Sequence, residues 1–130
     1  MSPQQLAELS VLDRAELQER MLGNDALADR LLSKFLTTAP SECDDLESSI
    51  RLGDRQAVAS LAHRHKGTAR TLATHRVAAQ AEQIETQAST DSVSDLLEML
   101  DQMRRLHDEV RDAVELTSNV AEPQQGANLK

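Results

Sequence analysis

The chain has 130 residues, of which 39% are apolar and 28% charged, and its formal net charge is −8. A chain of this length fits one domain with a single core. The acidic balance opposes nucleic-acid binding, which needs clustered Lys and Arg. Phe35 is the one aromatic side chain. Aromatic-lined grooves and β-sheets, which favour aromatic and β-branched residues, are therefore not expected.

Cysteine content and targeting signals indicate the compartment. A single cysteine, Cys43, cannot form an internal disulfide, so no oxidising compartment is implied. No apolar run approaches the roughly 20 residues that span a bilayer. The first residues lack the basic start and apolar stretch of a signal peptide. We therefore expect a cytoplasmic protein that does not bind membranes.

The first half of the chain predicts two helices. Asp13 is a candidate cap for a short helix over residues 13–22, and Gly23 separates it from the next one. Apolar residues then keep a 3-4-3-4 rhythm over residues 25–52. Pro40 interrupts this run, but the apolar stripe stays in phase across it. We therefore expect one long helix with a kink rather than two helices.

The second half predicts three more helices, over residues 54–72, 73–87 and 91–116, of which Asp54 caps the first. Residues 1–11 are expected to be flexible. Residues 117–130 lose all periodicity and are expected to form a disordered tail. The four longer helices pack most simply as an all-α, antiparallel up-down four-helix bundle over residues 12–116, with the short helix covering one end.

The charge is distributed unevenly along the chain. Residues 91–116 hold three basic residues against eight acids, a local charge of −5. Residues 54–85 reverse the sign, with five basic residues against three acids, a local charge of +2. Lys66 and Arg70 are among the cations that lie on the same predicted helix as His63 and His65.

A polar face of this helix surrounds His63. At about 100° per residue, the face lies opposite the apolar stripe that contains His65. Glycine in mid-helix costs about 1 kcal/mol relative to Ala, which makes sense if another molecule approaches the helix closely there. The residues that share the face with His63 are Gln56, Ala59, Ser60, Lys66, Gly67 and Arg70.

This composition suits a histidine that accepts a phosphoryl group. An ordinary imidazole is largely neutral at pH 7 and hence nucleophilic without a base. Lys66 and Arg70 would stabilise the phosphoryl oxygens. Gln56, Ala59, Ser60 and Arg64 would form the surrounding partner surface. On spacing alone, an ordinary solvated face that happens to contain His, Lys and Arg fits equally well.

Residues 62–73, Ala-His-Arg-His-Lys-Gly-Thr-Ala-Arg-Thr-Leu-Ala, resemble the signature of histidine-containing phosphotransfer (HPt) domains. That signature reads Ala-His-x-Leu-Lys-Gly-Ser/Thr-Ala, followed by Leu-Gly-Ala and later by Leu-Glu, to which Ile84-Glu85 is similar. The upstream residues Leu32, Phe35, Leu36, Pro40, Leu46 and Leu52-Gly53-Asp54 also resemble the family. The resemblance covers roughly residues 12–114.

The resemblance implies a four-helix bundle that carries phosphoryl groups but has no ATP site and hence no kinase activity of its own. His63 would receive the group from an aspartyl phosphate on a receiver domain and pass it to another receiver, with Lys66 and Gly67 in supporting places. Expected partners are response-regulator receivers and a hybrid sensor histidine kinase. The chain itself would hold no cofactor or metal and act as a monomer, and Mg²⁺ would be bound by the receiver.

Two residues depart from the family pattern. His65 stands where Leu is usual, and Ala73 stands where Gly is usual. If His65 were the acceptor, Thr68 and Ala69 would occupy the places of Lys and Gly. We therefore assign His63 as the acceptor and interpret His65 as a core histidine.

The remaining candidates are assigned structural roles. His63 and His65 project to opposite sides of a helix and cannot share a metal. His107, among charged neighbours, is expected to be solvated, and Cys43 is expected to lie in the core. His75 lies near the start of the next predicted helix and could approach His63 only through tertiary packing. The alternative function is a bundle that docks a receiver or another signalling partner without transferring phosphate.

Overall fold

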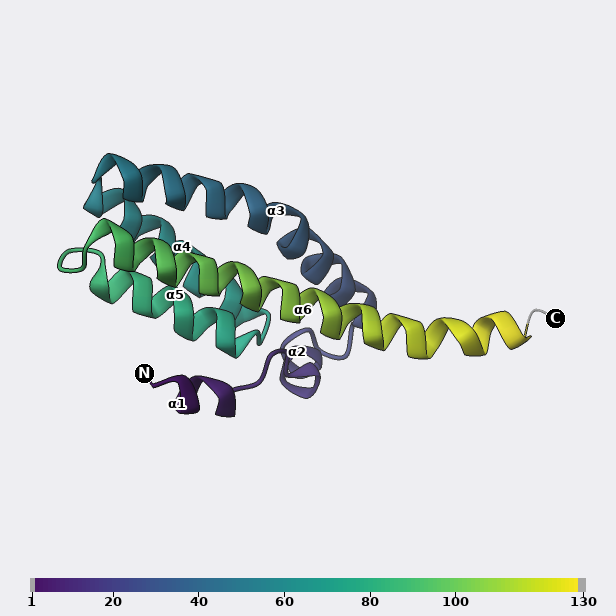
Figure 1. The fold of residues 1–130 in the computed structure, drawn as a ribbon. Coiled ribbons are helices and arrows are strands. Elements are labelled where there is room, and N and C mark those ends of the chain that lie inside the picture. The colour runs from purple at the N-terminus through teal and green to yellow at the C-terminus, as the bar shows by residue number, and fades with distance from the viewer. Residues whose placement is uncertain (1, 129–130) are drawn as a thin grey trace.

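The computed structural model describes residues 2–128, and for Pro3 and residues 117–128 it describes the backbone alone. This part of the chain folds into α-helices without strands (Figure 1). The expected all-α class is confirmed. The helices are α1 (Pro3–Glu8), α2 (Arg14–Arg20), α3 (Asp25–Leu52), α4 (Arg55–Thr71), α5 (His75–Gln87) and α6 (Val93–Asn128).

The four long helices form an up-down bundle, as predicted. Helix α3 packs on α4, α4 on α5, α5 on α6 and α6 on α3, so the contacts close a ring. Figure 1 shows these helices side by side, with the short α2 at one end. Each helix contributes an apolar stripe to one continuous core. Members of this core with almost no exposed surface include Leu32, Leu46, Ile84, Leu100 and Val110.

Polar side chains cap the helix starts. Asp13, Asn24 and Asp54 cap α2, α3 and α4 by accepting backbone N–H bonds of 3.0, 3.0 and 3.1 Å. Such caps satisfy donors that the helix itself leaves unpaired. Gly53 ends α3 with a φ of 73°, in the left-handed region that glycine adopts without steric cost. The predicted caps at Asp13 and Asp54 are thus confirmed.

Helix α3 passes through Pro40 without ending, as the in-phase stripe predicts. Proline has no N–H, so the carbonyl of Leu36 loses its usual donor. Arg111 on α6 replaces that donor, with Nη2 lying 3.4 Å from the Leu36 oxygen. Figure 1 shows α3 curving along its length toward α6. The cost of the proline is therefore reduced by a contact from the neighbouring helix.

The turn between α4 and α5 differs from the predicted boundary. Helix α5 begins at His75 and not at residue 73. Ala73 is fully buried and has a φ of 56°, the conformation that glycine would supply at this position in the family pattern. Its carbonyl accepts the Asp13 N–H at 3.0 Å. Ala73 therefore ties the turn between α4 and α5 to the start of α2, in a conformation that costs about 1 kcal/mol for an L-residue.

The N-terminal segment, expected to be flexible, contains α1. Ser2 and Gln5 form a reciprocal capping box at its start. Arg76 on α5 donates to the backbone oxygens of Leu9 and Ala7, both at 2.8 Å, and to Glu109 on α6 at 3.0 Å. This side chain connects the N-terminal segment to the bundle, a contact that no local sequence pattern indicates.

At the other end of the chain, α6 begins at Val93 and its backbone stays helical up to Asn128, beyond the predicted end at residue 116. The side chains of residues 117–128, together with residues 129 and 130, lie outside the described part of the chain. The disordered tail over residues 117–130 therefore stays a prediction.

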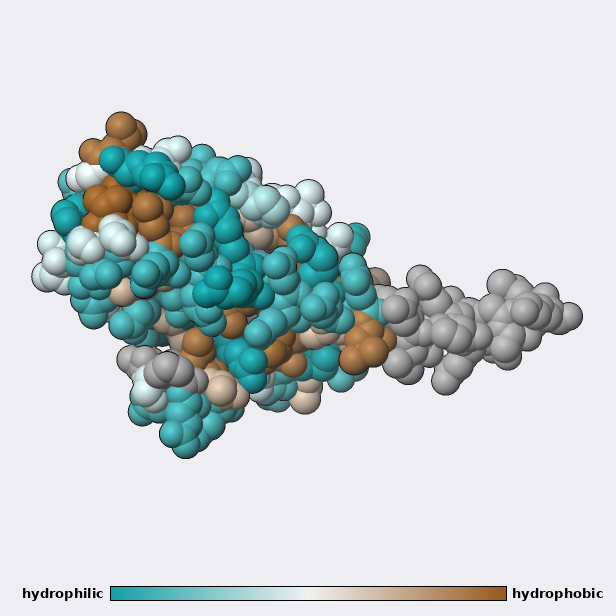
Figure 2. All heavy atoms as spheres, viewed as in Figure 1, coloured by the Kyte–Doolittle hydropathy of each residue, from teal (hydrophilic) through white to brown (hydrophobic). Residues whose placement is uncertain are grey.

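The face drawn in Figure 2 is mostly hydrophilic, with smaller apolar patches. Among the described residues, four large apolar side chains are exposed: Leu22 between α2 and α3, Leu52 at the end of α3, Val93 at the start of α6, and Leu116 further along α6. Isolated apolar residues of this kind are normal on a soluble domain.

Candidate functional site

His63 lies on the outward face of α4 with 68% of its side chain exposed. The helix is held by its Asp54 cap and by the buried residues Val58, Ala62 and Ala69, which fix the opposite face in the core. Helical spacing therefore presents the imidazole to solvent on a rigid element. This is the orientation that the sequence predicts.

A carboxylate from the neighbouring helix joins His63 to Lys66. Glu85 on α5 places Oε2 2.8 Å from His63 Nδ1 and Oε1 2.6 Å from Lys66 Nζ. The Lys66 side chain is only 12% exposed, so its ammonium is held close to the helix surface. The three side chains form a compact cluster around the Glu85 carboxylate, which we call the His63–Glu85–Lys66 cluster.

The cluster decides which imidazole nitrogen can react. The Lys66 ammonium is the main cause that holds the pKa of Glu85 below its usual range; desolvation opposes it and the bond to His63 adds to it. Glu85 is therefore ionised at neutral pH and can only accept hydrogen bonds. Neutral His63 then carries its proton on Nδ1, and its Nε2 presents a free lone pair.

Arg70 lies one helical turn beyond Lys66 and is also paired. Its Nη2 lies 3.2 Å from Glu82 Oε1, and both side chains are about half exposed. The two cations expected to bind phosphoryl oxygens are thus each paired with a carboxylate of α5. Exposed pairs of this kind are weak, so the Arg70 guanidinium is available to an incoming anion.

Two other cations of the positive segment, Arg55 and Arg76, have structural partners. Arg55 donates to the backbone oxygens of Ala88 and Asp91 at 2.7 and 2.8 Å, which ties the start of α4 to the turn before α6. Arg76 holds the N-terminal segment as described above. Part of the positive charge of residues 54–85 is therefore engaged away from His63.

Gly67 occupies a position where the fold does not require glycine. A Cβ built there meets nothing within 4 Å, and its φ is not in the left-handed region. Because Gly67 has no side chain, the surface of α4 at this position is open to the approach of another molecule. The predicted partner residues lie around it on α4: Gln56, Ser60 and Arg64 are exposed, and Ala59 is partly buried.

Glu85 is a site residue that the sequence analysis does not assign. The signal is present, because Ile84-Glu85 matches the final pair of the family pattern. No spacing rule relates a residue on α5 to one on α4, however, so only the packing of the two helices shows that Glu85 reaches both His63 and Lys66.

Two further histidines lie in the core. His65 is 2% exposed, as predicted, and Cys43 is also buried. The expectation that His107 is solvated is wrong, since it is only 5% exposed and its Nε2 lies 2.7 Å from His65 Nε2. His107 follows Met103 by four positions and precedes Val110 by three, so it falls on the apolar stripe of α6 despite its charged neighbours.

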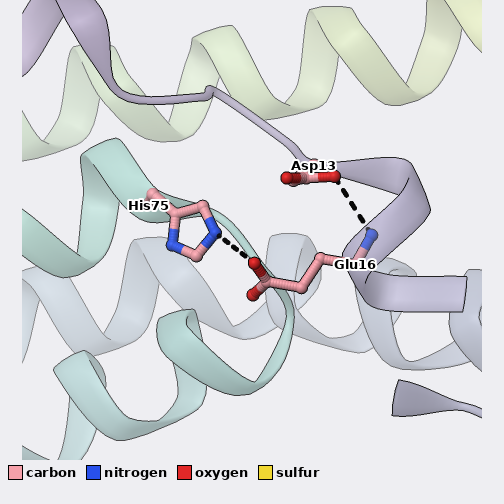
Figure 3. Close-up of side chains that lie close together, drawn as sticks. All are labelled: Asp13, Glu16 and His75. Carbon is pink, nitrogen blue, oxygen red and sulfur yellow. Dashed lines mark hydrogen bonds and ion pairs between the residues drawn. The ribbon is translucent and has the colours of Figure 1, made fainter. Parts of the chain in front are cut away.

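One group of side chains within the described residues has the spacing of metal ligands. The ligand atoms of Asp13, Glu16 and His75 all lie within 4.8 Å of one another (Figure 3). His75 Nε2 lies 3.2 Å and Arg20 Nη2 2.8 Å from the Glu16 carboxylate, and Asp13 accepts the Glu16 N–H. These side chains are thus engaged by one another and by Arg20, and they tie α2 to the start of α5.

Comparison with known proteins identifies the family. The Hpt domain family model matches residues 30–113, more than half of the chain, and the chain belongs to this family. It therefore has a phosphotransfer role in two-component signalling, in which Hpt domains work with receiver domains and hybrid kinases. No curated protein matches the sequence. Among the described residues, no helix is long and apolar enough to cross a membrane.

Two solved structures share the fold. Histidine-containing phosphotransfer protein B (HptB) from Pseudomonas aeruginosa PAO1 is 21% identical, with a TM-score of 0.73 over 82% of this chain and 93% of that one. The HPT domain of the Hpt sensor hybrid histidine kinase from Shewanella is 17% identical, with a TM-score of 0.65 over 82% of this chain and 95% of that one.

Proposed function

We propose that His63 accepts a phosphoryl group from the aspartyl phosphate of a receiver domain and passes it to a second receiver. The observation that carries this proposal is the 2.8 Å contact between Glu85 and His63 Nδ1, which leaves Nε2 as an exposed nucleophile. The fixed cation Lys66 lies in the same cluster, as phosphoryl transfer needs.

The transfer uses few groups of this chain. The Nε2 lone pair attacks phosphorus, an N–P bond forms, and the P–O bond to the aspartyl group breaks with its electron pair leaving on the carboxylate. The ring becomes cationic and keeps its Nδ1 proton, which Glu85 stabilises through the hydrogen bond. Lys66 donates to Glu85 through one N–H, so its remaining donors can bind phosphoryl oxygens. Mg²⁺ would be held by the receiver.

The environment of His63 also supports docking of a receiver. Gly67 and Ala59 leave the helix surface low beside the imidazole, so that partner loops can approach it. The bundle closes its own core without a second copy, and we therefore expect the chain to act as a monomer. We place its action in the cytoplasm, where the sequence alone also places it.

The test is phosphotransfer from a phosphorylated receiver, followed by mapping of the label. We expect acid-labile phosphate on His63 and none on His63→Gln. His75→Gln is the matched control, because it removes another partly exposed histidine and should still be labelled. A chain that binds phosphorylated receivers but gains no label would be an adaptor, and equal labelling of His63→Gln would also contradict the proposal.

A further inference from the structure

The core of the bundle contains a polar pair among apolar side chains. His65 on α4 and His107 on α6 are both at least nine-tenths buried, and their Nε2 atoms lie 2.7 Å apart. The Phe35 ring stacks on His65 at 5.4 Å between centroids and meets His107 edge-on at 5.5 Å. His65 occupies the position where the family pattern has Leu, and the phosphotransfer proposed for His63 does not use the pair.

The contact between two Nε2 atoms restricts the protons that the pair can hold. One Nε2 must donate and the other accept, because two N–H groups cannot face each other at 2.7 Å. The neutral pair fulfils this with one shared proton. One extra proton fits as well, since either ring can become an imidazolium and donate to the other. A second extra proton would place two cations in direct contact in the core.

The outer nitrogens fix the direction of the chain of hydrogen bonds. His65 Nδ1 has no hydrogen-bond partner and lies 3.6 Å from the Glu42 carboxylate, while His107 Nδ1 lies 3.6 Å from Cys43 Sγ. A proton on His65 Nδ1 faces Glu42, His107 Nε2–H donates to His65, and the Cys43 thiol donates to His107. The reverse order would turn a bare nitrogen lone pair toward the carboxylate.

The surroundings oppose charge on His107. Burial is the main cause that lowers the pKa of His107 to about 3, and the neighbouring His65 and two arginines add to it. Burial also raises the pKa of Cys43 to about 11, so the thiol keeps its proton. The titratable or charged groups that act on the pair or on Glu42 come from three helices: Glu42 and Cys43 on α3, Arg64 on α4, and Arg104 and Arg111 on α6.

Surface hollows reach His107 and Glu42 in the folded protein. A hollow of about 230 Å³ beside Pro40 is lined by Cys43 and His107. Glu42, whose carboxylate faces His65, lines an open groove of about 600 Å³ between α3 and α4. Protons can therefore exchange with the pair while the bundle stays folded.

We propose that His65 and His107 form an acid-sensitive lock between α4 and α6, which holds one added proton at most and opens when a second is forced onto it. In the unfolded chain each imidazole binds its own proton below about pH 6.5. The unfolded state thus binds at least one proton more than the folded state in acid. The folding equilibrium constant then falls about tenfold for each pH unit, so the stability contributed by the lock is present above pH 6.5 and lost on acidification.

The experiment compares denaturant unfolding of the wild type and of His65→Leu/His107→Leu from pH 7.5 to pH 5, where the carboxylates stay ionised. Leu at both positions restores an apolar core. Below about pH 6.5, we expect the equilibrium constant of the wild type to fall about tenfold more per pH unit than that of the double variant, with His75→Gln retaining the wild-type slope. Parallel curves for the wild type and the double variant would overturn the proposal.

A second measurement tests the proposed lock if the double variant does not fold. Nitrogen NMR of the wild-type imidazoles between pH 7.5 and pH 5 reports the protonation of each ring directly. We expect at most one imidazolium in the pair while the protein is folded. Two imidazolium rings in the folded protein at pH 5 would contradict the lock.

Discussion

A single carboxylate determines the chemistry at His63. Glu85 binds Nδ1 of the imidazole and Nζ of Lys66 with its two oxygens, so it orients the nucleophile and neutralises the cation beside it. An imidazole without this partner would divide its proton between both nitrogens and rotate freely. The geometry thus gives Glu85 the part of a positioning residue, which acts through His63 and not on the phosphoryl group.

Replacing Glu85 tests this role. We expect Glu85→Ala to lower the rate of phosphoryl transfer to His63 about tenfold, because a charge-assisted hydrogen bond contributes about 1.5 kcal/mol. Glu82→Ala is the matched control, since Glu82 pairs with Arg70 on the same two helices but does not touch His63. The rate is measured by single-turnover labelling. Equal losses in the two variants would show that Glu85 has no special part.

A substitution at Gly67 can distinguish an effect on folding stability from an effect on the docking of a partner. Because an added Cβ meets nothing within 4 Å, we expect Gly67→Ala to raise the free energy of unfolding by about 1 kcal/mol through helix propensity. The same methyl group should slow transfer by obstructing the receiver. Denaturant unfolding and labelling rates check the two effects. A variant that gains stability and transfers at the wild-type rate would remove Gly67 from the docking surface.

At the scale of the helices, α3 contains a proline whose missing backbone hydrogen bond is partly replaced by a donor on another helix. Arg111 supplies a hydrogen bond to the Leu36 carbonyl that Pro40 cannot supply. At 3.4 Å this bond is long, so it replaces the lost interaction only in part. The helix therefore keeps a local cost that comes from one residue.

Restoring the N–H at this position should stabilise the bundle. We expect Pro40→Ala to raise the free energy of unfolding by about 1–3 kcal/mol, because proline within a helix costs about 3 kcal/mol relative to Ala. Urea unfolding at pH 7 measures the change. Thr37→Ala is a control on the same helix that leaves Pro40 and Arg111 in place. A loss of stability in Pro40→Ala would mean that the bend itself is needed for packing.

The sequence predicts helices where the signal is local and fails where it depends on distant contacts. The in-phase stripe of residues 25–52 correctly indicates one helix across Pro40. Helix α1 has a local signal, the capping box of Ser2 and Gln5, but its attachment to the bundle through Arg76 has none. His107 is misassigned because its charged neighbours conceal its place on the apolar stripe.

At the scale of the whole molecule, the net charge of −8 is a poor guide to the surface around His63. Residues 54–85 hold five basic residues against three acids, but four of these five cations are engaged within the bundle. Arg55 and Arg76 bind backbone oxygens, and Lys66 and Arg70 pair with acids. The sequence gives the number of charged residues but does not show which of them are paired in the fold. The bundle was therefore predictable from the sequence, and its electrostatic surface was not.

The pairing within the His63–Glu85–Lys66 cluster has a consequence for the loaded protein. With neutral His63, the ionised Glu85 and the Lys66 ammonium cancel, so the empty carrier presents almost no net charge at its reactive centre. A phosphoryl group adds at least one negative charge there. The electrostatic potential near the surface therefore differs between the unphosphorylated and phosphorylated forms. This difference extends about one Debye length from the surface, which is about 8 Å at physiological salt. An anionic partner would thus distinguish them before contact, and a receiver that has just given up its phosphate would be repelled by the product it made.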